Sequence, residues 1–261
     1  MHGPALLFCP ADRPDRYAKA AAAADTVILD LEDAVAPADK PRAREALIAS
    51  ALDPERVIVR VNPAGTPAHA LDLVAVRASG YTTVMLAKAE SAAAVDATPD
   101  LRVLALCETA RGVLNAAEIA AHPGTAGLMW GAEDLIASMN GGSSRFADGR
   151  YRDVARTARA NVLLSARAHG KEAIDAVHLD IADLDGLRTE CEDAAASGFT
   201  ATACIHPTQV ATIRAAYAST DTEREWARAV LAEAEGQPGV FRFRGRMIDE
   251  PVLRQAREIL R

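Results

Sequence analysis

The chain has 261 residues, of which 50% are hydrophobic and 25% are charged, a balance typical of a folded globular protein rather than a disordered or fibrous one. Its 36 acidic and 29 basic residues give a net charge of −7, so nucleic acid is not expected as a partner, because phosphate binding needs a basic surface. The four cysteines lie far apart without a CxxC pair, which argues against a zinc signature and favours a reducing, cytoplasmic location. Neither a signal peptide nor a membrane span is predicted.

Short apolar runs that predict β-strands recur along the chain, and an alanine-rich amphipathic stretch typical of a helix follows each one. The predicted strands are Ala5–Cys9, Thr26–Leu31, Val57–Val61, Thr83–Leu86, Arg102–Cys107, Gly127–Trp130, Ala173–Leu179 and Thr202–Ile205. The predicted helices are Arg13–Ala23, Pro41–Ala51, Ala68–Ala78, Ser91–Val95, Leu114–Ala121, Asp153–His169, Leu184–Ser197 and Thr208–Ala218. This repeated βα order predicts an α/β fold.

The predicted strands are apolar without alternation, which indicates a parallel sheet that helices cover on both faces. A doubly wound sheet usually carries a glycine-rich phosphate loop after its first strand, whereas this chain has FCPADRPDR there. We therefore predict a TIM (β/α)8 barrel over residues 1–220. The longest predicted loop, Ser138–Arg152, is polar and glycine-rich, so it is either an active-site lid or a flexible linker.

Residues 221–261 do not continue the βα repeat. A helix is predicted over Thr222–Glu235, and the string FRFRGRMID follows, with three arginines beside Asp249. This C-terminal extension either covers the barrel wall or contributes to an active site or a subunit contact.

Charged side chains gather where the predicted strands end, which is where a βα barrel carries its active site. A concentration of carboxylates needs a cation, and hard oxygen ligands without paired cysteines favour Mg²⁺, or Mn²⁺, over Zn²⁺. The strand-end residues are Asp30, Glu32, Asp33, Arg60, Asn62, Lys88, Glu90, Glu108, Glu133, Asp134, His178, Asp180 and His206.

Glu108 and Asp134 are the predicted metal ligands. They end consecutive strands, so they should lie side by side and share one ion, with water and substrate filling its other positions. The alternative is that either acid caps the helix that follows it.

Arg60 is a charged residue inside a strand that otherwise reads as buried, so it should face the barrel mouth and hold a carboxylate. That carboxylate is either the substrate's or a protein group such as Glu32 or Asp33. Asp33 could also orient a metal-bound water from outside the coordination sphere. Candidate substrate-binding residues are Lys88 and His206 at strand ends, and Arg13, Arg16 and Lys19, which open the first helix where a phosphate could bind.

Eight strings in order across nearly the whole chain carry a family resemblance. They resemble the citrate lyase β-subunit-like proteins of the HpcH/HpaI aldolase superfamily. The strings are FCPADRPDRYAKA, VILDLEDAVAPADK, VRVNPAGTP, LAKAES, LCETARGVLNAAEIA, GLMWGAEDL, CIHPTQV and GRMIDEPVLRQA.

The resemblance implies a Mg²⁺-binding TIM barrel that cleaves or forms a carbon–carbon bond in β-hydroxyacyl thioesters such as malyl-, citramalyl-, 3-hydroxy-3-methylglutaryl- or citryl-CoA. It also implies a homo-oligomer, often a trimer. Glu108 in the ETARG motif and Asp134 in the GAEDL motif match the family's metal ligands, and Arg60 matches the arginine that grips the oxoacid. Asp249 matches an aspartate that reaches a neighbouring subunit's active site as the acid/base.

Some positions depart from the family pattern. Ala11 stands where relatives usually have glycine, and Ala87 where they have proline. These departures, together with the unmatched loop Ser138–Arg152, concern the acyl-group pocket and the coenzyme A contacts rather than the metal centre.

Three other functions stay open at this level. The same site could direct water at the acyl carbon of an acyl-CoA and act as a thioesterase. The chain could also be a subunit that binds a carrier-protein-linked acyl group in a citrate lyase complex, or a non-catalytic metal-binding barrel.

Overall fold

The structure, a computed structural model, describes residues 2–237 and 239–260. Eight parallel strands form a closed barrel in chain order, and β1 pairs with β8 to close it. The TIM-barrel prediction is confirmed. The strands are β1 (Ala5–Pro10), β2 (Thr26–Asp30), β3 (Val57–Val61), β4 (Thr83–Leu86), β5 (Arg102–Cys107), β6 (Thr125–Trp130), β7 (Glu172–Asp175) and β8 (Ala201–Cys204).

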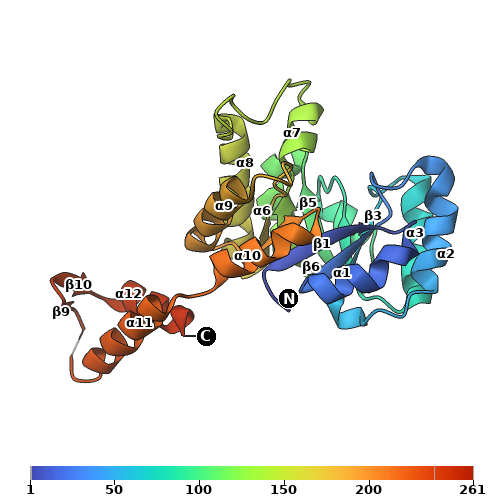
Figure 1. Ribbon diagram of the computed structural model, residues 1–261. Helices are drawn as coiled ribbons and strands as arrows, with labels where there is room; N and C mark the ends of the chain where they lie inside the picture. The colour runs from blue at the N-terminus through green and yellow to red at the C-terminus, as the bar shows by residue number, and fades with distance from the viewer. Residues whose placement is uncertain (1, 238, 261) are drawn as a thin grey trace. The chain divides into compact units, whose positions relative to one another are not determined.

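Helices connect successive strands and lie outside the barrel (Figure 1). None of those in the described part of the chain is long and apolar enough to cross a membrane. They are α1 (Tyr17–Ala23), α2 (Lys40–Ile48), α3 (Pro67–Ser79), α4 (Ala92–Asp96), α5 (Ala110–Leu114), α6 (Ala116–Ala121), α7 (Ala132–Ser138), α8 (Asp153–Ala168), α9 (Leu184–Ser197) and α10 (Val210–Tyr217), with short 3-10 turns η1 (Pro14–Arg16), η2 (Pro37–Asp39), η3 (Pro54–Arg56) and η4 (Pro207–Gln209).

The barrel interior is a packed core rather than a pore. Each strand contributes at least one buried apolar side chain to a single cluster, as the layered interior of a TIM barrel requires. The cluster consists of Leu6, Ile28, Ile58, Met85, Leu104, Leu106, Met129, Ile174, Ala201 and Ala203. This core closes the barrel below the strand ends and leaves the carboxyl end for the site.

The end of one predicted strand differs from the structure, and one helix was not predicted. β7 ends at Asp175 rather than at Leu179, because the buried Asp175 carboxylate accepts the Trp130 indole N–H at 2.6 Å and pairs with Arg159 at 2.8 Å. The short helix α7, which places Asp134, was not predicted.

The loop between α7 and α8 is anchored at several points. The Ser144 hydroxyl donates to Glu133 at 2.6 Å, and the Arg145 guanidinium pairs with Glu190 at 2.5 Å. The Tyr151 ring meets the Trp130 ring edge to face, with 5.2 Å between centroids. A flexible linker would not carry such contacts.

The chain divides into two compact units, residues 1–216 and residues 217–261. The second unit contains α11 (Asp221–Ala234), an antiparallel hairpin of β9 (Phe241–Phe243) and β10 (Arg246–Ile248), and α12 (Glu250–Ile259). The hairpin was not predicted. Apolar side chains from both helices and the hairpin form a separate core, made of Ala227, Val230, Ile248, Leu253 and Ala256.

Candidate active site

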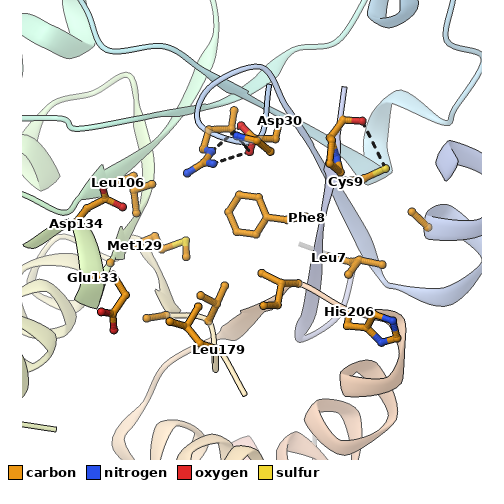
Figure 2. Close-up of a pocket in the computed structure, with 18 of the residues that line it drawn as sticks. Leu7, Phe8, Cys9, Asp30, Leu106, Met129, Glu133, Asp134, Leu179 and His206 are labelled. Atoms are coloured by element: carbon orange, nitrogen blue, oxygen red, sulfur yellow. Dashed lines mark hydrogen bonds and ion pairs between the residues drawn. The ribbon is translucent and has the colours of Figure 1, made fainter. Parts of the chain in front are cut away.

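A cavity of about 690 Å³ opens at the carboxyl ends of the barrel strands. Its floor is apolar and includes Phe8, Leu106 and Met129, while charged side chains stand around it. Figure 2 shows the Phe8 ring in the middle of the cavity, with Asp134 and His206 on opposite sides of it.

Arg60 is held by the carboxylate of Asp30. The two residues are direct partners in the β2–β3 register, so their side chains meet at the barrel mouth. Nε donates to Oδ1 at 2.7 Å and Nη2 to Oδ2 at 2.5 Å, and Glu32 lies 3.3 Å from Nη1. The guanidinium lies 4.9 Å from the Phe8 ring centroid. A fixed positive charge is thus presented to the cavity, and its main protein partner is Asp30, with Glu32 second.

Glu108 directly follows β5 and is only 2% exposed. Burial and, after it, the negative charge of Asp134 raise the pKa of its carboxyl to about 8. Neither acid is a helix N-cap, because Thr109 caps α5 and Gly131 occupies that position in α7. The helix-capping alternative is therefore wrong for Glu108, whereas Asp134 lies in the first turn of α7 without being its N-cap.

Gly131 leaves the space that Glu108 occupies. A Cβ atom at this position would lie 2.9 Å from Glu108 Oε2 and 3.0 Å from Glu108 Cβ. Because real Cβ contacts are longer, a larger residue would displace the Glu108 carboxylate from its present position.

Lys88 lies among the carboxylates. Its ammonium is 2.5 Å from Glu32, 3.2 Å from Asp33, 3.5 Å from Asp134 and 3.9 Å from Glu108. Burial raises the pKa of Glu32, although the charges of Arg60 and Lys88 lower it. The four acids therefore form one electrostatic cluster around a single ammonium.

The remaining predicted residues divide into two groups. Arg16, Lys19 and His206 line the cavity. Arg13 does not, and its guanidinium donates to Asp15 at 3.0 Å. Asp249 belongs to the second unit, where its carboxylate caps α12 by accepting the Val252 N–H at 3.4 Å.

His178 is a structural histidine in this arrangement. It lies outside the cavity and its Nδ1 is 2.9 Å from Glu190, and this hydrogen bond raises its pKa.

No role in the site was predicted from the sequence for three residues that the structure places in or beside it. Asp30 was noted as a strand end, but its pairing with Arg60 depends on the strand register. Phe8 reads as one more apolar strand residue, although it faces the cavity. Lys40 supports the cluster from below by donating to the carbonyl oxygens of Leu31 at 2.7 Å and Glu32 at 2.8 Å; a lysine at a helix start gives no signal for this.

The donor set fits a divalent cation with few protein ligands. Within residues 2–237 and 239–260 no group of three or more histidine, cysteine, aspartate or glutamate side chains is arranged as a complete metal cage. A pair of carboxylates, one of them buried, suits Mg²⁺, which keeps several water or substrate ligands.

Known proteins resemble this chain over nearly its whole length. The family model described as HpcH/HpaI aldolase/citrate lyase matches residues 5–207. The citrate lyase subunit beta-like protein of Mycobacterium tuberculosis strain H37Rv is 58% identical over 259 residues, covering 99% of this chain and 95% of that protein. The (3S)-malyl-CoA thioesterase of Cereibacter sphaeroides strain ATCC 17025 is 36% identical over 269 residues, covering 98% of this chain and 92% of that protein.

A solved structure is similar over the same extent. The crystal structure of CitE from Mycobacterium tuberculosis in complex with magnesium, acetoacetate and coenzyme A superimposes with a TM-score of 0.95 at 58% identity. The match covers 99% of this chain and 97% of that chain.

Proposed function

The chain belongs to the HpcH/HpaI aldolase/citrate lyase family, and from this premise we propose that it is a Mg²⁺-dependent carbon–carbon lyase. Its substrates are β-hydroxyacyl-CoA thioesters such as malyl-, citramalyl-, 3-hydroxy-3-methylglutaryl- or citryl-CoA, and its products are acetyl-CoA and an oxoacid. The observation that carries the proposal is the buried Glu108 carboxylate beside Asp134, facing a cavity that also contains Arg60.

Glu108 and Asp134 would hold Mg²⁺. When bound, the ion supplies Lewis-acid stabilisation to the carbinol oxygen and the neighbouring carboxylate of the substrate. The related CitE structure, which contains magnesium, acetoacetate and coenzyme A together, supports this pairing of metal and oxoacid.

Arg60 would stabilise the negative charge that develops on the oxygen of the departing oxoacid. The bidentate contact with Asp30 fixes the guanidinium before the substrate binds, so its orientation needs no reorganisation during the reaction. Arg16 and Lys19, at the cavity edge, would bind coenzyme A phosphates.

The cleavage step begins when a base removes the hydroxyl proton of the substrate. The bond between the carbinol carbon and the thioester α-carbon then breaks, and its electron pair goes to the α-carbon as the enolate of acetyl-CoA. Asp249 would donate a proton to this carbon, and in the synthetic direction it would remove that proton.

Thioester hydrolysis is the second candidate. The 36% identical relative from Cereibacter sphaeroides is a (3S)-malyl-CoA thioesterase, and the same metal site could direct water at the acyl carbon. Its product is free CoA rather than acetyl-CoA, which makes the two reactions distinguishable.

The two candidates are separated by a product assay of the purified protein with each of the four thioesters, in Mg²⁺ and in excess EDTA. We expect Mg²⁺-dependent release of acetyl-CoA and an oxoacid. Free CoA without acetyl-CoA would support the thioesterase instead, and no turnover would favour a carrier-protein-linked substrate or a binding role.

The Gly131→Ala variant is expected to bind Mg²⁺ about 10–100-fold more weakly than wild type, because the added methyl group displaces Glu108. Isothermal titration calorimetry with MgCl₂ measures this change. The Gly142→Ala variant is a control, since nothing lies within 4 Å of a Cβ atom there. Equal Mg²⁺ affinity of the Gly131→Ala and Gly142→Ala variants would contradict the role of Gly131.

A further inference from the structure

Lys88 has an unusual backbone conformation for a lysine. Its φ is 49°, in the left-handed region that residues other than glycine and asparagine rarely adopt. Strain of this kind persists where the surrounding structure requires it, and it is frequent at functional sites. Here the Lys88 N–H donates to Glu108 Oε1 at 3.1 Å while the ammonium lies 3.9 Å from the same oxygen. The strained turn thus brings both ends of Lys88 to Glu108.

The contacts of the ammonium fall into two classes. Those with Glu32 and Asp33 are close, at 2.5 and 3.2 Å, whereas those with Asp134 and Glu108 are longer, at 3.5 and 3.9 Å. Lys88 is the side-chain cation within 4 Å of Glu108 and Asp134 in the described part of the chain, because Arg60 pairs with Asp30 and Glu32. The ammonium can therefore leave the Glu108–Asp134 pair and still keep its bond to Glu32.

We propose that Lys88 is an exchangeable counter-ion, which pairs with the Glu108–Asp134 site while no divalent cation is bound and moves away from it, towards Glu32 and Asp33, when one binds. This inference rests on the proposed function. An ammonium and a dication repel each other strongly at such distances in a partly buried site, and the two compete for the same oxygens. Lys88 therefore lowers the affinity for Mg²⁺ and stabilises the metal-free protein.

The Lys88→Met variant tests the exchange. Methionine keeps an unbranched side chain and the same backbone conformation, and it removes the charge together with the hydrogen bonds that the ammonium donates to Glu32 and Asp33. We expect Mg²⁺ to bind about tenfold more tightly to this variant in a titration with MgCl₂ alone, because a repelling charge is gone. Its Tm should fall below that of wild type in EDTA, and saturating Mg²⁺ should largely close the gap.

Two control variants test whether the change in Mg²⁺ affinity comes from the charge at position 88. The Lys88→Arg variant keeps the charge and should retain Mg²⁺ affinity within about threefold of wild type. The Lys19→Met variant removes one positive charge from the cavity lining, at a residue that forms no ion pair in the described part of the chain, and its Mg²⁺ affinity should also stay close to that of wild type.

Three outcomes would overturn the proposal. Wild-type or weaker Mg²⁺ affinity in Lys88→Met would show that no exchange occurs. If the Tm of Lys88→Met fell below that of wild type by the same amount with and without Mg²⁺, Lys88 would have only a structural role. If Mg²⁺ bound to neither wild type nor Lys88→Met, the metal site of the proposed function itself would be rejected. This outcome is distinct from the other two because it also appears in wild type.

Discussion

The Glu108→Gln variant is expected to lose Mg²⁺-dependent cleavage by about 10³-fold, because a ligand of the Lewis acid is removed. At the same time its metal-free form should be more stable than wild type at pH 8. Glutamine keeps the oxygen that accepts the Lys88 N–H and removes the charge that burial and Asp134 disfavour. A gain in stability together with a loss of activity marks a residue retained for function.

The stability difference should depend on pH in a defined direction. The pKa of Glu108 is about 8 in the folded protein against an ordinary value of 4.5, so between these values the folded state binds more protons at this site than the unfolded state. The contribution of Glu108 to the stability of metal-free wild type is therefore fully present below pH 4.5 and is lost as the pH rises through 8. Glutamine does not titrate, so the advantage of the variant should grow from little at pH 5 to on the order of 3 kcal/mol at pH 8.

Thermal unfolding in EDTA at pH 5, 6.5 and 8, together with a Mg²⁺ titration, measures both effects. The Glu133→Gln variant is the matched control, since Glu133 precedes Asp134 and bonds to Ser144 in the loop; its Mg²⁺ affinity should stay near that of wild type. Unchanged Mg²⁺ binding by Glu108→Gln would remove Glu108 from the metal site.

The barrel could be predicted from the sequence because its signals are local. All eight strands were placed by apolar runs, and their order puts Glu108 and Asp134 just after neighbouring strands. The end of β7 was misplaced because the run from Ala173 stays mostly apolar beyond Asp175. What stops the strand is a long-range network with Trp130 and Arg159, which no local pattern reports.

The contacts of the site depend on features that sequence spacing does not contain. Arg60 was expected to hold a carboxylate, but choosing Asp30 over Asp33 requires the β2–β3 register. The position of Lys88 depends on a left-handed backbone conformation, and nothing in the sequence predicts that conformation for a lysine. The space for the Glu108 side chain depends on Gly131, which lies between β6 and α7. The residues of the site could thus be predicted from the sequence, whereas the residues that each of them contacts could not.

The Asp249→Asn variant is expected to lose carbon–carbon lyase activity by about 10²–10⁴-fold while its Mg²⁺ affinity stays unchanged, because the proposed general acid/base is removed and neither proposed metal ligand is altered. Asparagine is a good N-cap, so it preserves the cap of α12 that Asp249 provides. Alanine would also remove that cap, at a cost of about 1 kcal/mol, and would mix folding with chemistry. The Glu250→Gln variant, which changes an exposed neighbour paired with Arg257, should keep its activity. Full lyase activity in Asp249→Asn would exclude the acid/base role.

The subunit that Asp249 serves can be identified by mixing two inactive variants. If Asp249 acts on a neighbouring barrel, an oligomer of Glu108→Gln and Asp249→Asn chains contains sites with an intact Glu108 from one chain and an intact Asp249 from another. Random mixing at equal amounts in a ring should then restore about one quarter of wild-type activity. If Asp249 acts on its own barrel, no mixed site is complete and the activity stays at the level of the separate variants. Co-expression of the two chains in equal amounts, purification through one affinity tag common to both chains, and the acetyl-CoA assay distinguish these results.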